Sequence, residues 1–316
     1  MRRLVTWAAA ATVVVCATAP ARADIPPVKV IDEPGDQQLS ASGNGTWYVF
    51  TSDSSAHPNR YDAYAQHVDG TNRTRLNPQG TAGHAGNFDP SANRVIYDQR
   101  SSTTPSNLWF FDLGLQTRSR VPGVNTKKWY EYDGLVATGS VLFDRDHRMG
   151  GVWYTDLILF DRVAGTGTVL GSWKAGRVFV TPGSVGDTTA SYEVVKVTAR
   201  AITINAFVYD IGGGTRSKIP VPAGRFAYAP TVDETNREVY FVRSGKGCGR
   251  NVSLRRVTLD NLDAAQEVLA SLPDRVDAGG LSLAPNTGAG NTDLLFTRYS
   301  CRTNAAHIFS LPGVAP

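Results

Sequence analysis

The sequence predicts an all-β fold in which six repeated units close into a ring, and three observations lead to this prediction. Short runs of β-branched and aromatic residues alternate with clusters of Gly, Asn, Asp and Pro along the chain. One of these runs recurs about every 49 residues. The 316 residues are 41% hydrophobic and 19% charged, which excludes collagen, coiled coils and disordered chains.

The recurring run ends in an aromatic residue that polar residues follow. The aromatic residues are Phe50, Tyr97, Phe143, Tyr192, Phe241 and Phe296. A second run follows each of them, and a third, shorter run follows in the first five units. Turns such as Asp69-Gly70 are typical of hairpins between these runs. A short innermost strand added to each unit gives four strands, which is the content of a propeller blade.

The sequence therefore predicts a six-bladed β-propeller over residues 24–316. One long β-sandwich, or two of them, is the alternative, but sandwich strands do not keep such a regular register. The sixth unit has no room for an outer strand after Leu311-Pro312, and we expect the alternating segment Val28–Ile31 to supply it, which also protects an open sheet edge. Only residues 262–269 could form a turn or two of helix.

Residues 1–23 have the pattern of a secretory signal peptide. Arg2 and Arg3 precede an apolar run, and Ala21-Arg22-Ala23 forms a cleavage site before Asp24. An uncleaved anchor is the alternative. No later segment reaches about 18 apolar residues, so we expect no transmembrane segment. The sequence thus predicts a secreted or cell-envelope protein.

Removal of this peptide changes the charge balance. Three of the 32 Lys and Arg residues lie in it and none of the 28 Asp and Glu residues, which leaves 29 against 28. A nucleic-acid partner is therefore not expected. Cys248 and Cys301 remain, and in an exported protein an even number predicts a disulfide, with two buried thiols as the alternative. The repeat places both in equivalent loops of the fifth and sixth units. A bridge would contribute roughly 3–4 kcal/mol on chain-entropy grounds.

Two segments resemble the TolB-like family of WD40-like propellers. The segment 87–97, NFDPSANRVIY, resembles the family's FSPDGKRIAF segment, and 63–76, AYAQHVDGTNRTRL, is similar to its strand–turn–strand motif. The resemblance covers the mature chain and implies a six-bladed propeller, but its motifs specify a fold and not an activity. The later units depart from the pattern, since 231–236 lacks the Pro-Asp-Gly turn. The partner of TolB itself is not implied.

Motifs of catalysis are scarce. The sequence contains no G-x-S-x-G, H-E-x-x-H, C-x-x-C or P-loop motif, so we predict no cofactor and no metal. His57, His84 and His147 are placed in loops, where a general-base or metal role would require a carboxylate partner.

The loops between the second and third strands of each unit should share one face around the central channel, here called the loop face. They span 51–61, 98–106, 144–154, 193–201, 242–251 and 297–304, with eleven basic and five acidic residues. Arginine around a funnel suits carboxylates or phosphates, so the candidate ligand-binding residues are Arg100, Arg145, His147, Arg148, Arg243 and Arg298. Charges paired with neighbouring Asp residues are the alternative.

These observations favour a monomeric, non-catalytic binding propeller whose loop face recognises a protein, a peptide or an anionic envelope ligand. The alternative is an enzyme at the channel mouth, of the lyase or lactonase type, that acts on an acidic sugar or lactone. Convergence of His147 and a carboxylate such as Asp98 or Asp144 with loop arginines around a deep pocket would favour the enzyme, whereas a wide, flat mouth would favour binding. A purely structural envelope protein is the third possibility.

Overall fold

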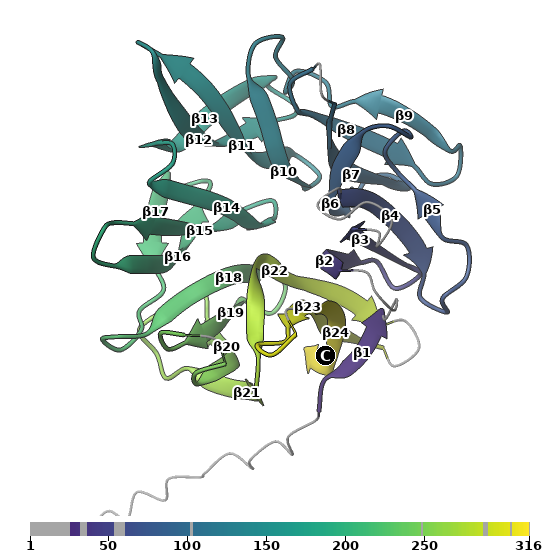
Figure 1. The fold of residues 1–316 in the computed structure, drawn as a ribbon. Helices are drawn as coiled ribbons and strands as arrows, with labels where there is room; N and C mark the ends of the chain where they lie inside the picture. The colour runs from purple at the N-terminus through teal and green to yellow at the C-terminus, as the bar shows by residue number, and fades with distance from the viewer. Residues whose placement is uncertain are drawn as a thin grey trace, which may run out of the picture.

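The computed structural model describes residues 26–31, 37–53, 61–101, 104–247, 249–286, 290–303 and 305–315. The predicted signal peptide, His57 and Cys248 lie outside the described residues. Within them, strands form six four-stranded antiparallel sheets, arranged as blades around a central axis (Figure 1). The structure confirms the predicted six-bladed propeller. No helix that could cross a membrane occurs in the described part of the chain.

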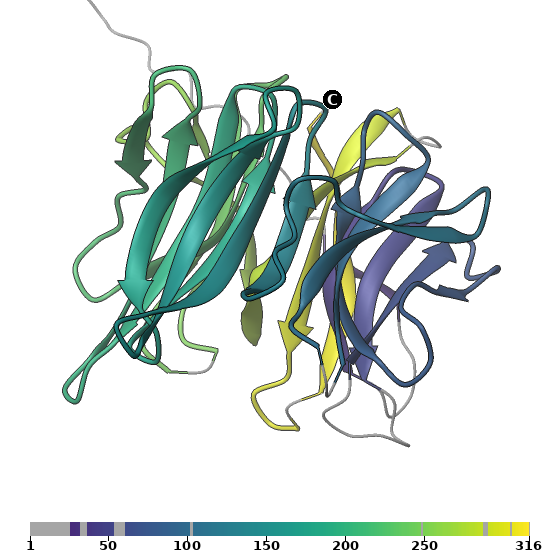
Figure 2. The same ribbon diagram turned by 90° about the horizontal axis from the view of Figure 1, so that it is seen from above.

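Each blade contains four strands in order from the axis outward. The innermost strands are β2 (Gln37–Gly43), β6 (Ala82–Phe88), β10 (Tyr130–Val136), β14 (Val178–Val185), β18 (Phe226–Asp233) and β22 (Arg275–Asn286). The second strands are β3 (Trp47–Asp53), β7 (Arg94–Arg100), β11 (Ser140–Met149), β15 (Thr189–Val197), β19 (Glu238–Ser244) and β23 (Asn291–Tyr299). Figure 2 shows the strands running between the two loop-bearing faces of the ring.

The outer half of each blade follows the same order. The third strands are β4 (Tyr61–His67), β8 (Asn107–Asp112), β12 (Val152–Asp161), β16 (Ile202–Asp210), β20 (Val252–Thr258) and β24 (Ala306–Ala315). The outer strands are β5 (Thr74–Arg75), β9 (Thr117–Arg120), β13 (Thr166–Lys174), β17 (Thr215–Lys218), β21 (Glu267–Leu272) and, in the sixth blade, β1 (Val28–Ile31). β1 pairs antiparallel with β24, as the sequence predicts. Residues 262–269 form a turn and the start of β21, so no helix forms there.

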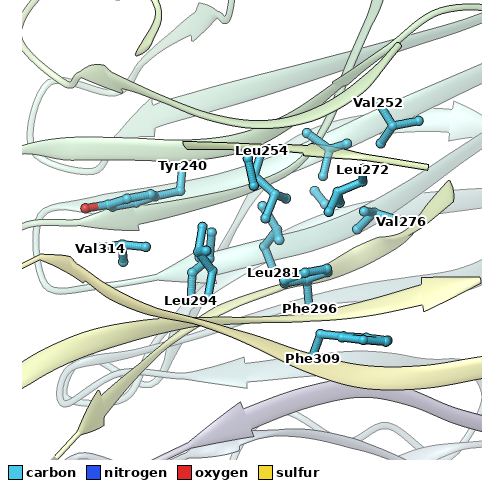
Figure 3. Packing of buried hydrophobic residues seen from close by; sticks show 14 of the residues in the cluster. Tyr240, Val252, Leu254, Leu272, Val276, Leu281, Leu294, Phe296, Phe309 and Val314 are labelled. Carbon is cyan, nitrogen blue, oxygen red and sulfur yellow. The ribbon is translucent and has the colours of Figure 1, made fainter. Parts of the chain in front are cut away.

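Apolar side chains fill each of the six blade interfaces. The six recurring aromatics lie in the second strands and are all fully buried. The cluster between blades 5 and 6 contains Tyr240, Leu254, Leu294 and Phe296 (Figure 3). Every blade thus packs against its two neighbours, and this packed scaffold positions the loops at the loop face.

The innermost strands carry a bulge opposite the buried aromatic of the second strand. In blades 1 to 5 the cross-strand register shifts within residues 39–42, 85–88, 132–135, 182–184 and 228–231. The bulges bring neighbouring blades close together. A Cβ on Gly86 would lie 2.1 Å from the carbonyl oxygen of Gly134 in the next blade, so only glycine fits there. The innermost strands of all six blades enclose a central cavity of about 210 Å³.

Candidate functional site

The six predicted ligand-binding residues lie in strands and not in loops. Arg100 ends β7, Arg145, His147 and Arg148 belong to β11, Arg243 belongs to β19, and Arg298 belongs to β23. The prediction of a loop over 144–154 was wrong because strand pairing continues as far as Met149 and Val152. The same holds for 193–201, where β15 extends to Val197.

Three of these residues pair with carboxylates. Arg145 Nε lies 3.0 Å from Glu131 Oε1, and Arg298 Nε lies 3.3 Å from Asp274 Oδ2. His147 Nε2 lies 3.0 Å from Oδ2 of Asp156, its neighbour on β12. The convergence of His147 with Asp98 or Asp144 that would favour an enzyme therefore does not occur.

The other three have no carboxylate partner among the described residues. Arg148 Nε donates to the carbonyl of Gly151 at 3.2 Å within its own turn. Arg100 is exposed, and Arg243 is partly buried beside another arginine, Arg225. Among the predicted ligand-binding arginines of the loop face, Arg100 and Arg243 are thus the two whose guanidinium groups contact neither a carboxylate nor a carbonyl of the described residues.

The residue that follows each buried aromatic, here called the latch residue, connects one blade to the next. In blades 1, 2, 4 and 6 its side chain accepts a hydrogen bond from an amide at the register shift of the following blade, whereas the latch residue of blade 5, Val242, has no side-chain acceptor. The four observed pairs are Ala85 N to Thr51 Oγ1 at 2.9 Å, Asp133 N to Asp98 Oδ2 at 3.4 Å, Ala229 N to Glu193 Oε2 at 2.7 Å and Ser40 N to Thr297 Oγ1 at 3.1 Å. These bonds satisfy buried amides that the bulge removes from the sheet.

Asp144, the latch residue of blade 3, lacks this partner. The equivalent bulge residue in blade 4 is Pro182, which has no N–H to donate. Asp144 is only 7% exposed, and its Oδ1 has no hydrogen-bond partner among the described residues. Burial and the nearby carboxylates of Asp133, Asp146 and Asp98 raise the pKa of Asp144 well above its ordinary value. This carboxyl group is therefore unusual in the ring, because it is buried and receives no hydrogen bond from the next blade.

His84 and Asp98 form an ion pair beside Asp144. His84 Nδ1 lies 3.3 Å from Asp98 Oδ2, and the amide of His84 donates to Asp98 Oδ1. Burial alone would lower the pKa of His84, but Asp98 and then Asp133 outweigh it and raise this pKa to about 9. His84 lies in β6 and not in a loop, which corrects its predicted position.

Asp133 completes this group at the channel. Its side chain is exposed within the channel, although the six blades surround it. Burial and repulsion from Asp98 raise the pKa of Asp133 to about 6, against an opposing effect of His84. One ligand atom from each of His84, Asp98 and Asp133 lies within 4.8 Å of the others. Imidazole and carboxylate together suit a divalent transition metal, so these three residues could hold one.

Aromatic side chains extend this site along blade 3. Tyr130 stacks on Tyr132 with ring centroids 6.2 Å apart, and Trp153 lies 5.9 Å from Tyr130. Trp153 is 41% exposed. Tyr132 faces Asp144 across the strands, and burial together with Asp146 and Asp144 raises its pKa. An exposed aromatic group beside carboxylates suits a ligand with both apolar and polar parts.

An open cavity lies between blades 4, 5 and 6. Its volume is about 800 Å³, and its wall includes the turns that join the second and third strands of blades 4 and 5, so it lies on the loop face. The wall is mainly apolar, with Val195, Ile202, Ile204, Phe226, Val252 and Val276. Three cations, Arg200, Lys246 and Arg275, line it, and its one carboxylate among the described residues is that of Glu193, which serves as a latch residue.

Cys301 lies next to the segment that contains the other cysteine. A Cβ on Gly249 would lie 3.2 Å from the Sγ of Cys301. The predicted disulfide with Cys248 stays a prediction, since Cys248 lies outside the described residues.

Comparison with known proteins supports the fold. No family model and no curated protein matches the chain. Among solved structures, a putative TolB from Agrobacterium tumefaciens is 13% identical with a TM-score of 0.57, covering 90% of this chain and 93% of that one. An oligogalacturonate lyase in complex with manganese is also 13% identical, with a TM-score of 0.55 and coverage of 91% and 92%. The propeller domain of the trilobed protease from Pyrococcus furiosus is 10% identical, with a TM-score of 0.52 and coverage of 89% and 97%. At these identities the likeness defines the class, a six-bladed β-propeller related in shape to TolB-like proteins.

Proposed function

We propose that this chain is a binding propeller of the cell envelope or exterior, and that its loop face recognises an extended peptide segment of another protein. The cavity between blades 4, 5 and 6 carries this proposal. A volume of about 800 Å³ accommodates one or two large apolar side chains, and its wall of Val, Ile and Phe suits them.

The charge around the cavity defines the peptide further. Neither Arg200 nor Lys246 pairs with a carboxylate among the described residues, and Arg275 lies over the ring of Tyr299 at 4.6 Å. These cations favour acidic residues beside the apolar anchor. Ile202, whose side chain is 51% exposed, lies at the wall and is available to contact such a peptide.

Fluorescence anisotropy with labelled peptide pools tests this proposal. One pool has a Phe, Leu or Trp flanked by Asp and Glu, and the matched pool has the same anchor flanked by Lys. We expect the acidic pool to bind more tightly. Ile202→Ala removes contacts worth about 2 kcal/mol and should weaken binding by at least about tenfold.

Leu115→Ala is the matched control, because Leu115 is 74% exposed in the turn after β8, at the other face of the ring. Equal binding of the two pools, or an unchanged affinity of the Ile202 variant, would contradict the proposal.

An enzyme at the channel mouth is the second candidate, and the group of His84, Asp98, Asp133 and Asp144 favours it. The group contains a histidine that stays protonated above neutrality and carboxyl groups with raised pKa values, which general acid–base catalysis uses. The fold is shared with an oligogalacturonate lyase. Incubation with galacturonate oligomers, followed by ultraviolet absorbance of an unsaturated product, tests this candidate. Activity that Asp144→Asn abolishes would support it, whereas no product with and without manganese would exclude this substrate.

A further inference from the structure

Three arginines lie on one face of blade 5. Arg243 in β19 is directly opposite Ser253 in β20, and Arg255 lies two residues further along β20. Side chains two apart in a strand share a face, so Arg255 is diagonal to Arg243. Arg225 lies two residues before Ala227, which pairs with Arg243, and a Cβ on Gly245 would lie 2.9 Å from its Nη1.

This face of blade 5 is directed toward blade 4. Below the arginines it continues as the apolar cluster of Val239, Phe241 and Val257, which packs against Ala206 and Val208 of blade 4. The peptide cavity uses alternate residues of the same strands, such as Val252 and Ser244. The three arginines therefore form a separate site.

The arginines have no counterion in the described part of the chain. Arg255 is only 9% exposed, and its Nε donates to Ser253 Oγ at 3.0 Å, with a second contact from Nη1 to the carbonyl of Gln266 at 3.4 Å. The adjacent Arg256 is different, because it contacts Glu238 at 3.2 Å and Glu267 at 2.6 Å.

Buried charges in proteins are normally paired, so the buried cation of Arg255, beside the partly buried cations of Arg243 and Arg225, is unfavourable unless an anion joins them. Burial, with Arg243 and Arg225 nearby, lowers the pKa of Arg255 to about 10. The same effects, burial and then Arg225, lower the pKa of Arg243.

A cavity of about 360 Å³ opens beside Arg243 and Arg255. Arg243 and Arg255 form one wall, residues 220–222 of the connection between blades 4 and 5 form another, and Asp263, Ala264 and Gln266 complete it. Asp263 is the one carboxylate in the described lining. Its side chain is exposed and makes no ion pair with these arginines. The volume readily admits a tetrahedral oxyanion.

We propose that Arg243 and Arg255 bind a phosphate or sulfate group in this cavity, and that the nearby charge of Arg225 strengthens this binding. Each guanidinium presents paired N–H donors that match the oxygens of such a group, and three of them neutralise a dianion. The group belongs either to a free ion or to an ester on a larger molecule.

Isothermal titration calorimetry with inorganic phosphate tests the site, in a phosphate-free buffer at constant ionic strength. Wild-type protein should bind one phosphate, and Arg255→Met and Arg243→Gln should each weaken this binding by at least tenfold. Arg256→Gln is the matched control, because Arg256 is paired with carboxylates on the same strand, and it should bind phosphate as the wild type does. Circular dichroism confirms that each variant is folded. The proposal would be overturned if the wild-type protein did not bind phosphate, or if the Arg255 and Arg243 variants bound it as tightly as the wild type does.

Two further ligands distinguish the sources. Tighter binding of phenyl phosphate or phenyl sulfate than of the inorganic ions would assign the site to an ester group of a larger ligand. Equal or weaker binding of the esters would assign it to the free ion. Retention of peptide binding by the Arg255 variant would show that the two sites act separately.

Discussion

Replacement of Asp144 by Asn should stabilise the protein at neutral pH, which is the opposite of the usual effect of a change in the core. Asp144 is 7% exposed, and its Oδ1 has no hydrogen-bond partner among the described residues. The residue that would donate to it, Pro182, has no N–H, whereas the equivalent amides donate to Thr51, Asp98, Glu193 and Thr297. A buried polar group without a partner costs about 1–3 kcal/mol. An Asn side chain carries no charge and can donate to the neighbouring carboxylates of Asp133 and Asp146. We therefore expect a gain of about 1–3 kcal/mol at pH 7.

The pH dependence of this gain follows from the raised pKa of Asp144. At low pH the carboxyl group is protonated in both the folded and the unfolded chain, so wild type and variant should differ little. As the pH rises above about 4, the unfolded chain releases this proton while the folded protein retains it. The wild type thus loses stability relative to the variant, by at most about 1.4 kcal/mol per pH unit, until Asp144 ionises in the folded protein as well.

Urea unfolding between pH 3 and pH 8, followed by tryptophan fluorescence, measures this difference. A chelator is present throughout, because a bound cation would stabilise the wild type. Asp98→Asn is the contrasting variant: it breaks the ion pair with His84 and should destabilise at pH 7. A stability difference for Asp144→Asn that is constant with pH, or a loss at pH 7, would refute the account of an unpartnered carboxyl group.

Two further predictions concern the latch residues and the histidine pair. Thr51→Val keeps the shape of a fully buried side chain but leaves the Ala85 amide without an acceptor, so it should lower the free energy of unfolding by about 1–3 kcal/mol. Thr297→Val should have the same effect through the Ser40 amide. Denaturant unfolding measures both variants, and an unchanged midpoint would show that these hydrogen bonds do not stabilise the fold. The ring protons of His84 should titrate near pH 9 in NMR spectra, because the ion pair with Asp98 stabilises the protonated ring, and in Asp98→Asn this midpoint should move toward the ordinary value near 6.5. The stability that the pair contributes is complete below about pH 6.5 and is lost as the pH rises through 9. A midpoint near 6.5 in the wild-type protein would contradict this prediction.

The sequence predicted the blades because their strongest signal is local. A buried aromatic at the same point of each second strand repeats with the blade, and all six of these aromatics are fully buried. The closing strand was also predictable, since an alternating segment near the start and a missing strand near the end leave one solution. Its pairing of Val28 with Ser310 and of Lys29 with Phe309 confirms this reasoning.

The candidate site was less predictable because it depends on register between strands. Arg145 pairs with Glu131 of β10 and His147 with Asp156 of β12, and no local pattern in the sequence reveals these pairings. The pair of His84 and Asp98 joins residues 14 apart across β6 and β7. Loop charge alone placed cations on the loop face but could not show which carboxylates lie beside them.

One signal for the site was present in the sequence. The residue after each recurring aromatic is polar in five of the six units: Thr51, Asp98, Asp144, Glu193 and Thr297. A polar residue at a fixed position in a buried strand indicates a repeated hydrogen bond. The donor amide belongs to the following blade, so the sequence alone does not show that the residue at the donor position for Asp144 is Pro182, which has no N–H.

The two candidate functions make different demands on Asp144. Natural sequences break a local rule mainly where function requires it, and a buried carboxyl group that no amide satisfies breaks the rule that the other latch residues obey. A propeller that only binds a peptide between blades 4, 5 and 6 has no use for this group, so Asp144→Asn should leave peptide affinity unchanged while it raises stability. An enzyme that uses the channel mouth needs the proton that Asp144 retains, so the same variant should become more stable and inactive. A single substitution, assayed for stability, peptide binding and turnover, therefore separates the two functions.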